Sequence, residues 1–122
     1  MSPVTGTIQP ERANQWQPSV SSALRAAERA SRAAAVASAW AERSGVARAE
    51  ADEAVRAGAQ SREAANRAAV AMSADEVLHF ARLAEAAARL ALEADRRVST
   101  LIAASLWAAE DARLSPSLQS AA

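Results

Sequence analysis

The sequence predicts an all-α protein, and three observations agree on this fold class. Four prolines, at positions 3, 10, 18 and 116, leave the 96 residues from 19 to 114 without a helix breaker. Alanine, the strongest helix former, fills 37 of the 122 positions. Small residues also recur at alternating spacings of three and four, the heptad pattern of packed helices. We therefore expect a long antiparallel helical hairpin or a three-helix bundle, with alanine-rich, coiled-coil-like packing and oligomeric assembly.

The two ends of the chain are predicted to be irregular. Three prolines and a glycine mark residues 1–18 as an N-terminal arm. A single helical domain follows over residues 19–114, with serines available to cap its first turn. Residues 115–122 are expected to form a polar tail, because Pro116 should stop the last helix.

The last helix is predicted to run over residues 74–113. It follows the sequence Ser-Ala-Asp-Glu, a capping box in which Ser73 caps the new helix and Glu76 reaches back towards it. The chain is therefore expected to turn just before residue 74.

The segment 19–72 is predicted to form one helix or two. Its small residues at heptad spacing, which we call the seam, keep the same helical phase across Gly45 and Gly58, and this favours one long helix. Gly45 is also suited to a left-handed helix end, and a break there would give a three-helix bundle instead.

A seam of small residues is the predicted packing face of the domain. The last helix should lay larger side chains of the same seam into holes lined by alanine. Burial of an alanine side chain contributes far less free energy than the roughly 1.5–3 kcal/mol of a buried leucine. A core of this kind therefore favours assembly with further helices. The seam residues are Ala23, Ala30, Ala37, Ala47, Ala54 and Ala65, followed by Phe80, Leu83, Leu90, Val98 and Leu101.

Large apolar side chains outside the seam predict a partner-binding surface. The candidates are Val36, Trp40, Leu78, Leu92 and Trp107. Tryptophan is enriched at interface hot spots, and the last three candidates share one flank of the last helix. The expected partner is a second copy of the chain or another helical protein.

Catalytic chemistry has little support in this composition. One histidine, no cysteine and no tyrosine leave no nucleophilic triad, and no glycine-rich loop is present to hold a phosphate. The spacing Glu76-x-x-His79 is one part of a carboxylate-bridged metal site, to which a dimer could add a second copy and Glu50 a further ligand. The capping position of Glu76 competes with that use. We therefore expect a non-enzymatic protein without a cofactor, with a metal-dependent oxidase as an alternative.

Charge and hydropathy narrow the expected partners. Fourteen arginines balance fourteen acidic residues, and without a concentrated basic patch we expect no nucleic-acid binding. The longest uncharged apolar run, residues 98–109, is too short to span a bilayer, and the N-terminus lacks a signal-peptide pattern.

A cytoplasmic assembly protein is the leading hypothesis, as a self-associating scaffold, structural subunit or adaptor. The alternative is an amphipathic binder of lipid or polymer surfaces, similar to the alanine-rich helices of granule-coating phasins.

Overall fold

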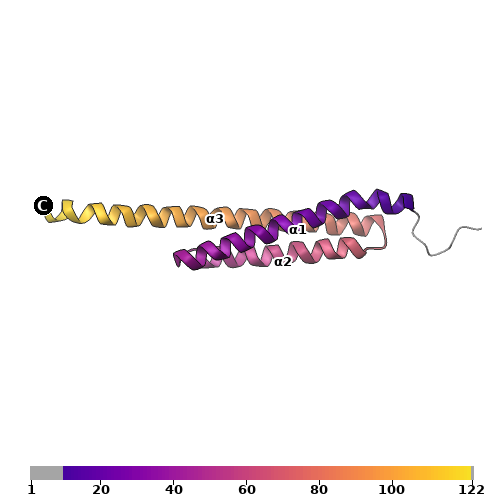
Figure 1. Cartoon of the computed structure of the whole chain (residues 1–122), viewed down its shortest axis with the longest axis horizontal. Helices are drawn as coiled ribbons and strands as arrows, with labels where there is room; N and C mark the ends of the chain where they lie inside the picture. The colour runs from indigo at the N-terminus through magenta and orange to yellow at the C-terminus, as the bar shows by residue number, and fades with distance from the viewer. Residues whose placement is uncertain (1–9, 122) are drawn as a thin grey trace, which may run out of the picture.

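Three helices pack side by side in the computed structural model, which describes the backbone of residues 10–121 and the side chains of residues 16–114. They are α1 (Pro10–Ser44), α2 (Arg48–Val70) and α3 (Ala74–Ala121). Each helix contacts both of the others, and the described residues contain no strand. The all-α prediction is therefore confirmed, and of its two architectures the chain forms the three-helix bundle (Figure 1).

The break at Gly45 separates α1 from α2. Gly45 has φ +74°, and its N–H donates to the carbonyl oxygen of Ala41 at 2.9 Å. A residue without Cβ takes this left-handed conformation at little cost, so the helix ends here and the chain reverses. One continuous helix over residues 19–72 is therefore wrong. The seam phase did not reveal the reversal because α1 and α2 each present an alanine face in the same periodicity.

The capping box forms at the second turn. The N–H of Glu76 donates to Ser73 Oγ at 3.2 Å, and Ser73 Oγ donates to the Glu76 carboxylate at 3.2 Å. Both contacts satisfy groups at the exposed start of a helix, and α3 begins at Ala74, the expected position.

Both predicted irregular ends are helical where the structure describes them. The helix α1 begins at Pro10 and contains Pro18, so the arm is wrong for residues 10–18, while residues 1–9 lie outside the described range. The helix α3 continues to Ala121 instead of ending near residue 113, so the tail is wrong for residues 115–121. The fixed φ of proline is itself a helical value, so a proline costs a hydrogen bond and strain without forbidding the helix.

The core of the bundle consists almost entirely of alanine. Among the side chains of residues 16–114, twenty-one apolar ones are buried, and all are alanine except Val77 and Val98. No leucine, isoleucine, methionine, phenylalanine or tryptophan is buried among the described side chains. Such small faces let helices pack closer than the usual 8–10 Å between axes.

Polar contacts between helices fix their relative register. Buried Ser61 on α2 donates from Oγ to the carbonyl oxygen of Ala84 on α3 at 2.7 Å. The other ties are Ser22 Oγ to the Glu85 carboxylate at 2.8 Å, Arg62 to Ser31 Oγ at 2.8 Å, and the Glu53–Arg97 ion pair at 2.5 Å. Together these contacts join every pair of helices.

Candidate interaction surface

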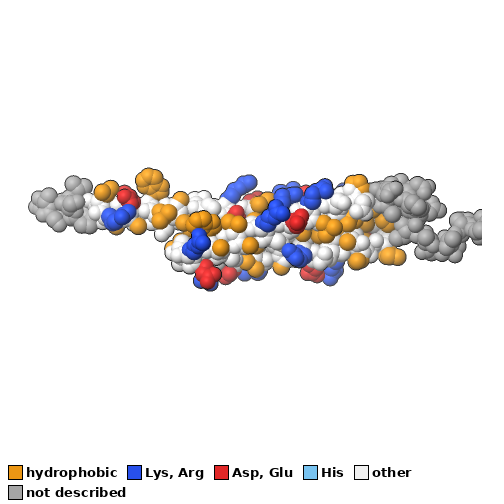
Figure 2. All heavy atoms as spheres, in the orientation of Figure 1, with side chains coloured by type: hydrophobic (Ala, Val, Ile, Leu, Met, Phe, Trp, Pro, Cys, Tyr) orange, Lys and Arg blue, Asp and Glu red, His pale blue; other side chains and the backbone are white. Residues whose placement is uncertain are grey.

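Large apolar side chains lie on the outside of the bundle. Figure 2 shows hydrophobic side chains interspersed with charged ones over the visible face. The exposed large residues are Leu24, Val36, Trp40, Val55, Val70, Met72, Leu78, Leu83, Leu90, Leu101, Leu106, Trp107 and Leu114. The bundle thus buries its small apolar residues and exposes its large ones, the reverse of an ordinary core.

The structure confirms only part of the predicted seam. Ala23, Ala30, Ala37, Ala54, Ala65 and Val98 are fully buried, and Ala47 and Phe80 are half-buried. Leu83, Leu90 and Leu101 are exposed, so the packing of leucines into alanine holes is wrong. The physical reason is that α3 turns its stripe of Ala84, Ala91 and Ala94 towards the core. Three small faces leave no room for leucine between them.

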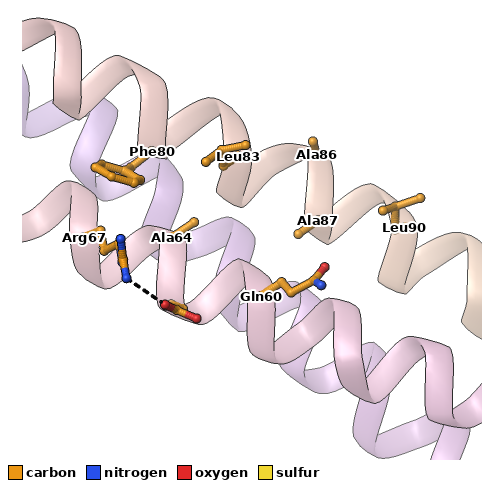
Figure 3. Close-up of a pocket in the computed structure, with 9 residues that line it drawn as sticks. Gln60, Ala64, Arg67, Phe80, Leu83, Ala86, Ala87 and Leu90 are labelled. Carbon is orange, nitrogen blue, oxygen red and sulfur yellow. Dashed lines mark ion pairs between the residues drawn. The ribbon is translucent and has the colours of Figure 1, made fainter.

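A groove of about 440 Å³ runs between α2 and α3. Figure 3 shows Phe80, Leu83 and Leu90 of α3 along one side of it. The other side carries the Glu63–Arg67 ion pair at 3.1 Å, and the Arg67 guanidinium lies 5.8 Å from the centre of the Phe80 ring. An apolar wall with a charged rim suits the side chains of an amphipathic helix.

A second surface, which we call the α1/α3 flank, contains Val36, Trp40, Leu92, Ser99 and Ala103. The helices α1 and α3 run in the same direction (Figure 1), and the hydrogen bond from Ser22 to Glu85 sets their offset. Trp40 lies eighteen residues after Ser22 on α1, and Ala103 lies eighteen residues after Glu85 on α3. Eighteen residues make five full turns, so Trp40 and Ala103 lie side by side as Ser22 and Glu85 do. Val36 and Ser99 lie fourteen residues, or nearly four turns, after Ser22 and Glu85, so they are neighbours for the same reason. The five residues therefore share one side of the bundle.

The register that defines the α1/α3 flank agrees with the core clusters. Ala23 packs in the same cluster as Ala84, and Ala41 in the same cluster as Val98, with Ile102 against it. These contacts follow the same order along α1 and α3 over the length of the bundle.

The helix α3 extends beyond the bundle. Figure 1 shows its C-terminal part running past the turn between α1 and α2. All side chains described from residue 103 to residue 114 are exposed, and Trp107 is 71% exposed. We call residues 103–121 the α3 extension. Most helical stability in proteins comes from tertiary packing, which the described side chains of this segment do not receive from the bundle.

The predicted partner-binding residues lie on the flank of α3 or beside it. Trp40 is 48% exposed, with the Arg43 guanidinium 5.6 Å from its ring centre. Leu92 is half-buried, and Leu78 lies near Pro18 at the far end of the same side. Sequence periodicity identified this side of α3 but could not place α1 beside it. Binding of a partner there stays a prediction.

Glu50 lies far from the other two candidate metal ligands, Glu76 and His79, which share the start of α3. Glu76 is engaged by Ser73, and exposed His79 packs edge-on against Phe80 with ring centres 5.1 Å apart. Glu50 lies in the first turn of α2, at one end of that helix. The other end, which leads into the start of α3 with Glu76 and His79, is roughly 30 Å away along the helix. Within the described residues, no group of three or more His, Cys, Asp or Glu side chains is arranged to hold a metal.

Asp95 is an unexpected feature of the core. Its Oδ1 atom is buried without a hydrogen-bond partner among the described residues, and burial raises the pKa of this carboxyl group. Asp95 follows Ala91 by four residues and precedes Val98 by three, which is seam spacing. That spacing was the one signal that could have placed it in the core.

Comparison with known proteins gives no relative. No protein-family model matches the chain, and no curated protein or solved structure shows significant similarity to it. Over the described residues, none of the helices combines the length and the apolar character that crossing a bilayer requires. The function must therefore be inferred from the surface of the bundle itself.

Proposed function

We propose that this chain is a non-enzymatic helical assembly protein that acts by associating with itself. The observation that carries the proposal is the reversed distribution of apolar side chains. The core holds alanine and two valines, while Trp40, Trp107 and six leucines of α3 are exposed, namely Leu78, Leu83, Leu90, Leu101, Leu106 and Leu114. Burial of such side chains is worth about 1.5–3 kcal/mol each, which is available only to an assembled form.

The surface of α3 has the properties of an interface. Tryptophan and leucine on the α1/α3 flank and the α3 extension are separated by arginine and glutamate. A centre of aromatic and aliphatic side chains within a polar rim is typical of protein–protein interfaces. Five or six such side chains would supply roughly 8–18 kcal/mol, which is comparable to the estimated 4–15 kcal/mol cost of association. Stable assembly therefore requires most of the flank.

The balance of charge favours the chain itself as the partner. Arginines and acidic residues are equal in number and are interleaved on the visible surface (Figure 2). A polyanion or an anionic membrane would select a basic face instead. A surface that carries both signs is best complemented by another surface of the same kind.

Size-exclusion chromatography with light scattering tests the proposal. We expect a dimer or larger species at micromolar concentrations, and loss of that species in a variant carrying both Trp40→Ala and Trp107→Ala. Val55→Ala is the control, because Val55 is nearly as exposed as Trp40 and lies on α2, away from the α1/α3 flank. A wild-type protein that stays monomeric at high micromolar concentration would refute self-association.

A further inference from the structure

We infer that two copies bind through antiparallel α3 helices, about a twofold axis at Ala103, with each α3 extension lying on the α1/α3 flank of the other copy. This inference rests on the proposed self-association and specifies its geometry. It also gives the α3 extension the helical partner that its own bundle does not supply.

The first support is a palindromic stripe along α3. Its members are Leu92, Arg96, Ser99, Ala103, Trp107, Glu110 and Leu114. The successive spacings of four, three, four, four, three and four residues read the same from either end. These spacings keep the side chains on one face of a helix. An antiparallel copy centred on Ala103 therefore brings residues of this stripe opposite other residues of the same stripe.

The second support is the chemistry of the pairs that result. Leu92 meets Leu114 of the other copy, and Arg96 meets Glu110. Ser99 leaves room for the large Trp107 ring, and the small Ala103 side chains meet at the crossing. Twofold symmetry repeats the Arg96–Glu110 pair, so the stripe gains two ion pairs and no like-charge contact between its members.

Shifting the two helices by one heptad removes this match. A shift that centres the pair between residues 106 and 107 sets Glu110 against Ala103. The opposite shift sets Arg96 against Ala103 and Glu85, which already binds Ser22, against Leu114. Charge complementarity therefore selects the register centred on Ala103.

The third support is the position of α1. The register of the bundle sets Trp40 across from Ala103, next to the proposed twofold axis, and Val36 across from Ser99. Trp107 of the second copy then comes to the side of the bundle that carries Val36. One interface thus covers both tryptophans that are exposed among the described residues, Trp40 of α1 and Trp107 of the α3 extension.

The overlap is also long enough to stabilise the extension. Residues 92–114 span roughly 33 Å of helix at 1.5 Å per residue. The overlap therefore extends over residues 103–114, the part of the α3 extension whose side chains the structure describes.

Site-directed disulfide formation tests the geometry, because the chain has no cysteine of its own. Under mild oxidation we expect Ala103→Cys to form a covalent dimer at least tenfold faster than Ala108→Cys, an exposed control position on another face of α3. A mixture of Ser99→Cys and Trp107→Cys proteins should form the mixed dimer. Light scattering of the wild-type chain is measured in parallel.

The outcomes separate the two proposals. A dimer in light scattering with no preference for Ala103→Cys overturns this interface and leaves self-association standing. Fastest bonding of Leu106→Cys, or of Ser99→Cys with itself, overturns the register in the same way. A monomer in light scattering overturns both proposals, whereas fast bonding at Ala103→Cys in a native dimer supports both.

Discussion

Gly58 on α2 lies so close to Ala30 on α1 that a Cβ atom on the glycine would lie 3.3 Å from the Ala30 carbonyl oxygen. The same Cβ would lie 3.3 Å from the Cβ of Ala34. The two helices therefore touch backbone against side chain at this point. This contact shows directly why the core has room for alanine and glycine and not for leucine.

Gly58→Leu should destabilise the bundle by about 2 kcal/mol or more, because the added side chain forces α1 and α2 apart. The free energy of unfolding from urea denaturation measures this effect. Ala59→Leu, at the exposed neighbouring position, is the control and should change stability little. Equal stability of Gly58→Leu and the control would mean that the two helices do not approach as closely as described.

Substitutions at Gly45 and Ala47 should have opposite effects. Both residues have positive φ, 74° and 64° respectively. Gly45→Ala should cost about 1 kcal/mol, and Ala47→Gly should gain about 1 kcal/mol, because Cβ is strained in the left-handed region. Thermal unfolding followed by circular dichroism gives the sign of each change. The same sign for both variants would argue against this turn geometry.

Asp95→Ala should stabilise the protein by about 1–2 kcal/mol at neutral pH, because it removes a buried oxygen without a partner. Burial raises the pKa of Asp95 above its ordinary value of 3.8. The folded state therefore binds the proton more tightly than the unfolded state, and the wild-type protein loses stability as pH rises from 3.8 through the raised pKa. The advantage of the variant should shrink on acidification and be smallest below pH 3.8. A pH-independent difference in unfolding free energy would contradict this account.

Local signals in the sequence predicted the start of α3 better than they predicted which of its residues are buried. The capping box at Ser73 placed the start of α3 because its contacts lie within four residues. The alanine seam of α1 and α2 was correct because no competing apolar stripe accompanies it. On α3 two apolar stripes lie one residue apart, with Leu83 and Leu90 in one and Ala84 and Ala91 in the other. The choice between them depends on the small faces of the other helices, which periodicity within α3 does not contain.

Reversing one charge of the proposed interface should weaken association about tenfold. In the dimer, Glu110→Arg places an arginine opposite Arg96 at two symmetry-related positions. Each exposed ion pair lost in this way is worth up to about 1 kcal/mol. Adding Arg96→Glu restores opposite charges and should recover most of the affinity. Sedimentation equilibrium gives both dissociation constants. Failure of the double variant to bind more tightly than Glu110→Arg alone would count against the pairing of these residues.

The central claim is that association covers the large side chains which the alanine core excludes. Its most direct test is sedimentation equilibrium of the Trp40→Ala variant beside the wild-type chain, with helix content measured by circular dichroism. We predict that the wild-type chain associates and that the variant keeps its helix content while its dissociation constant rises at least tenfold. Association of the variant with wild-type affinity would contradict the claim.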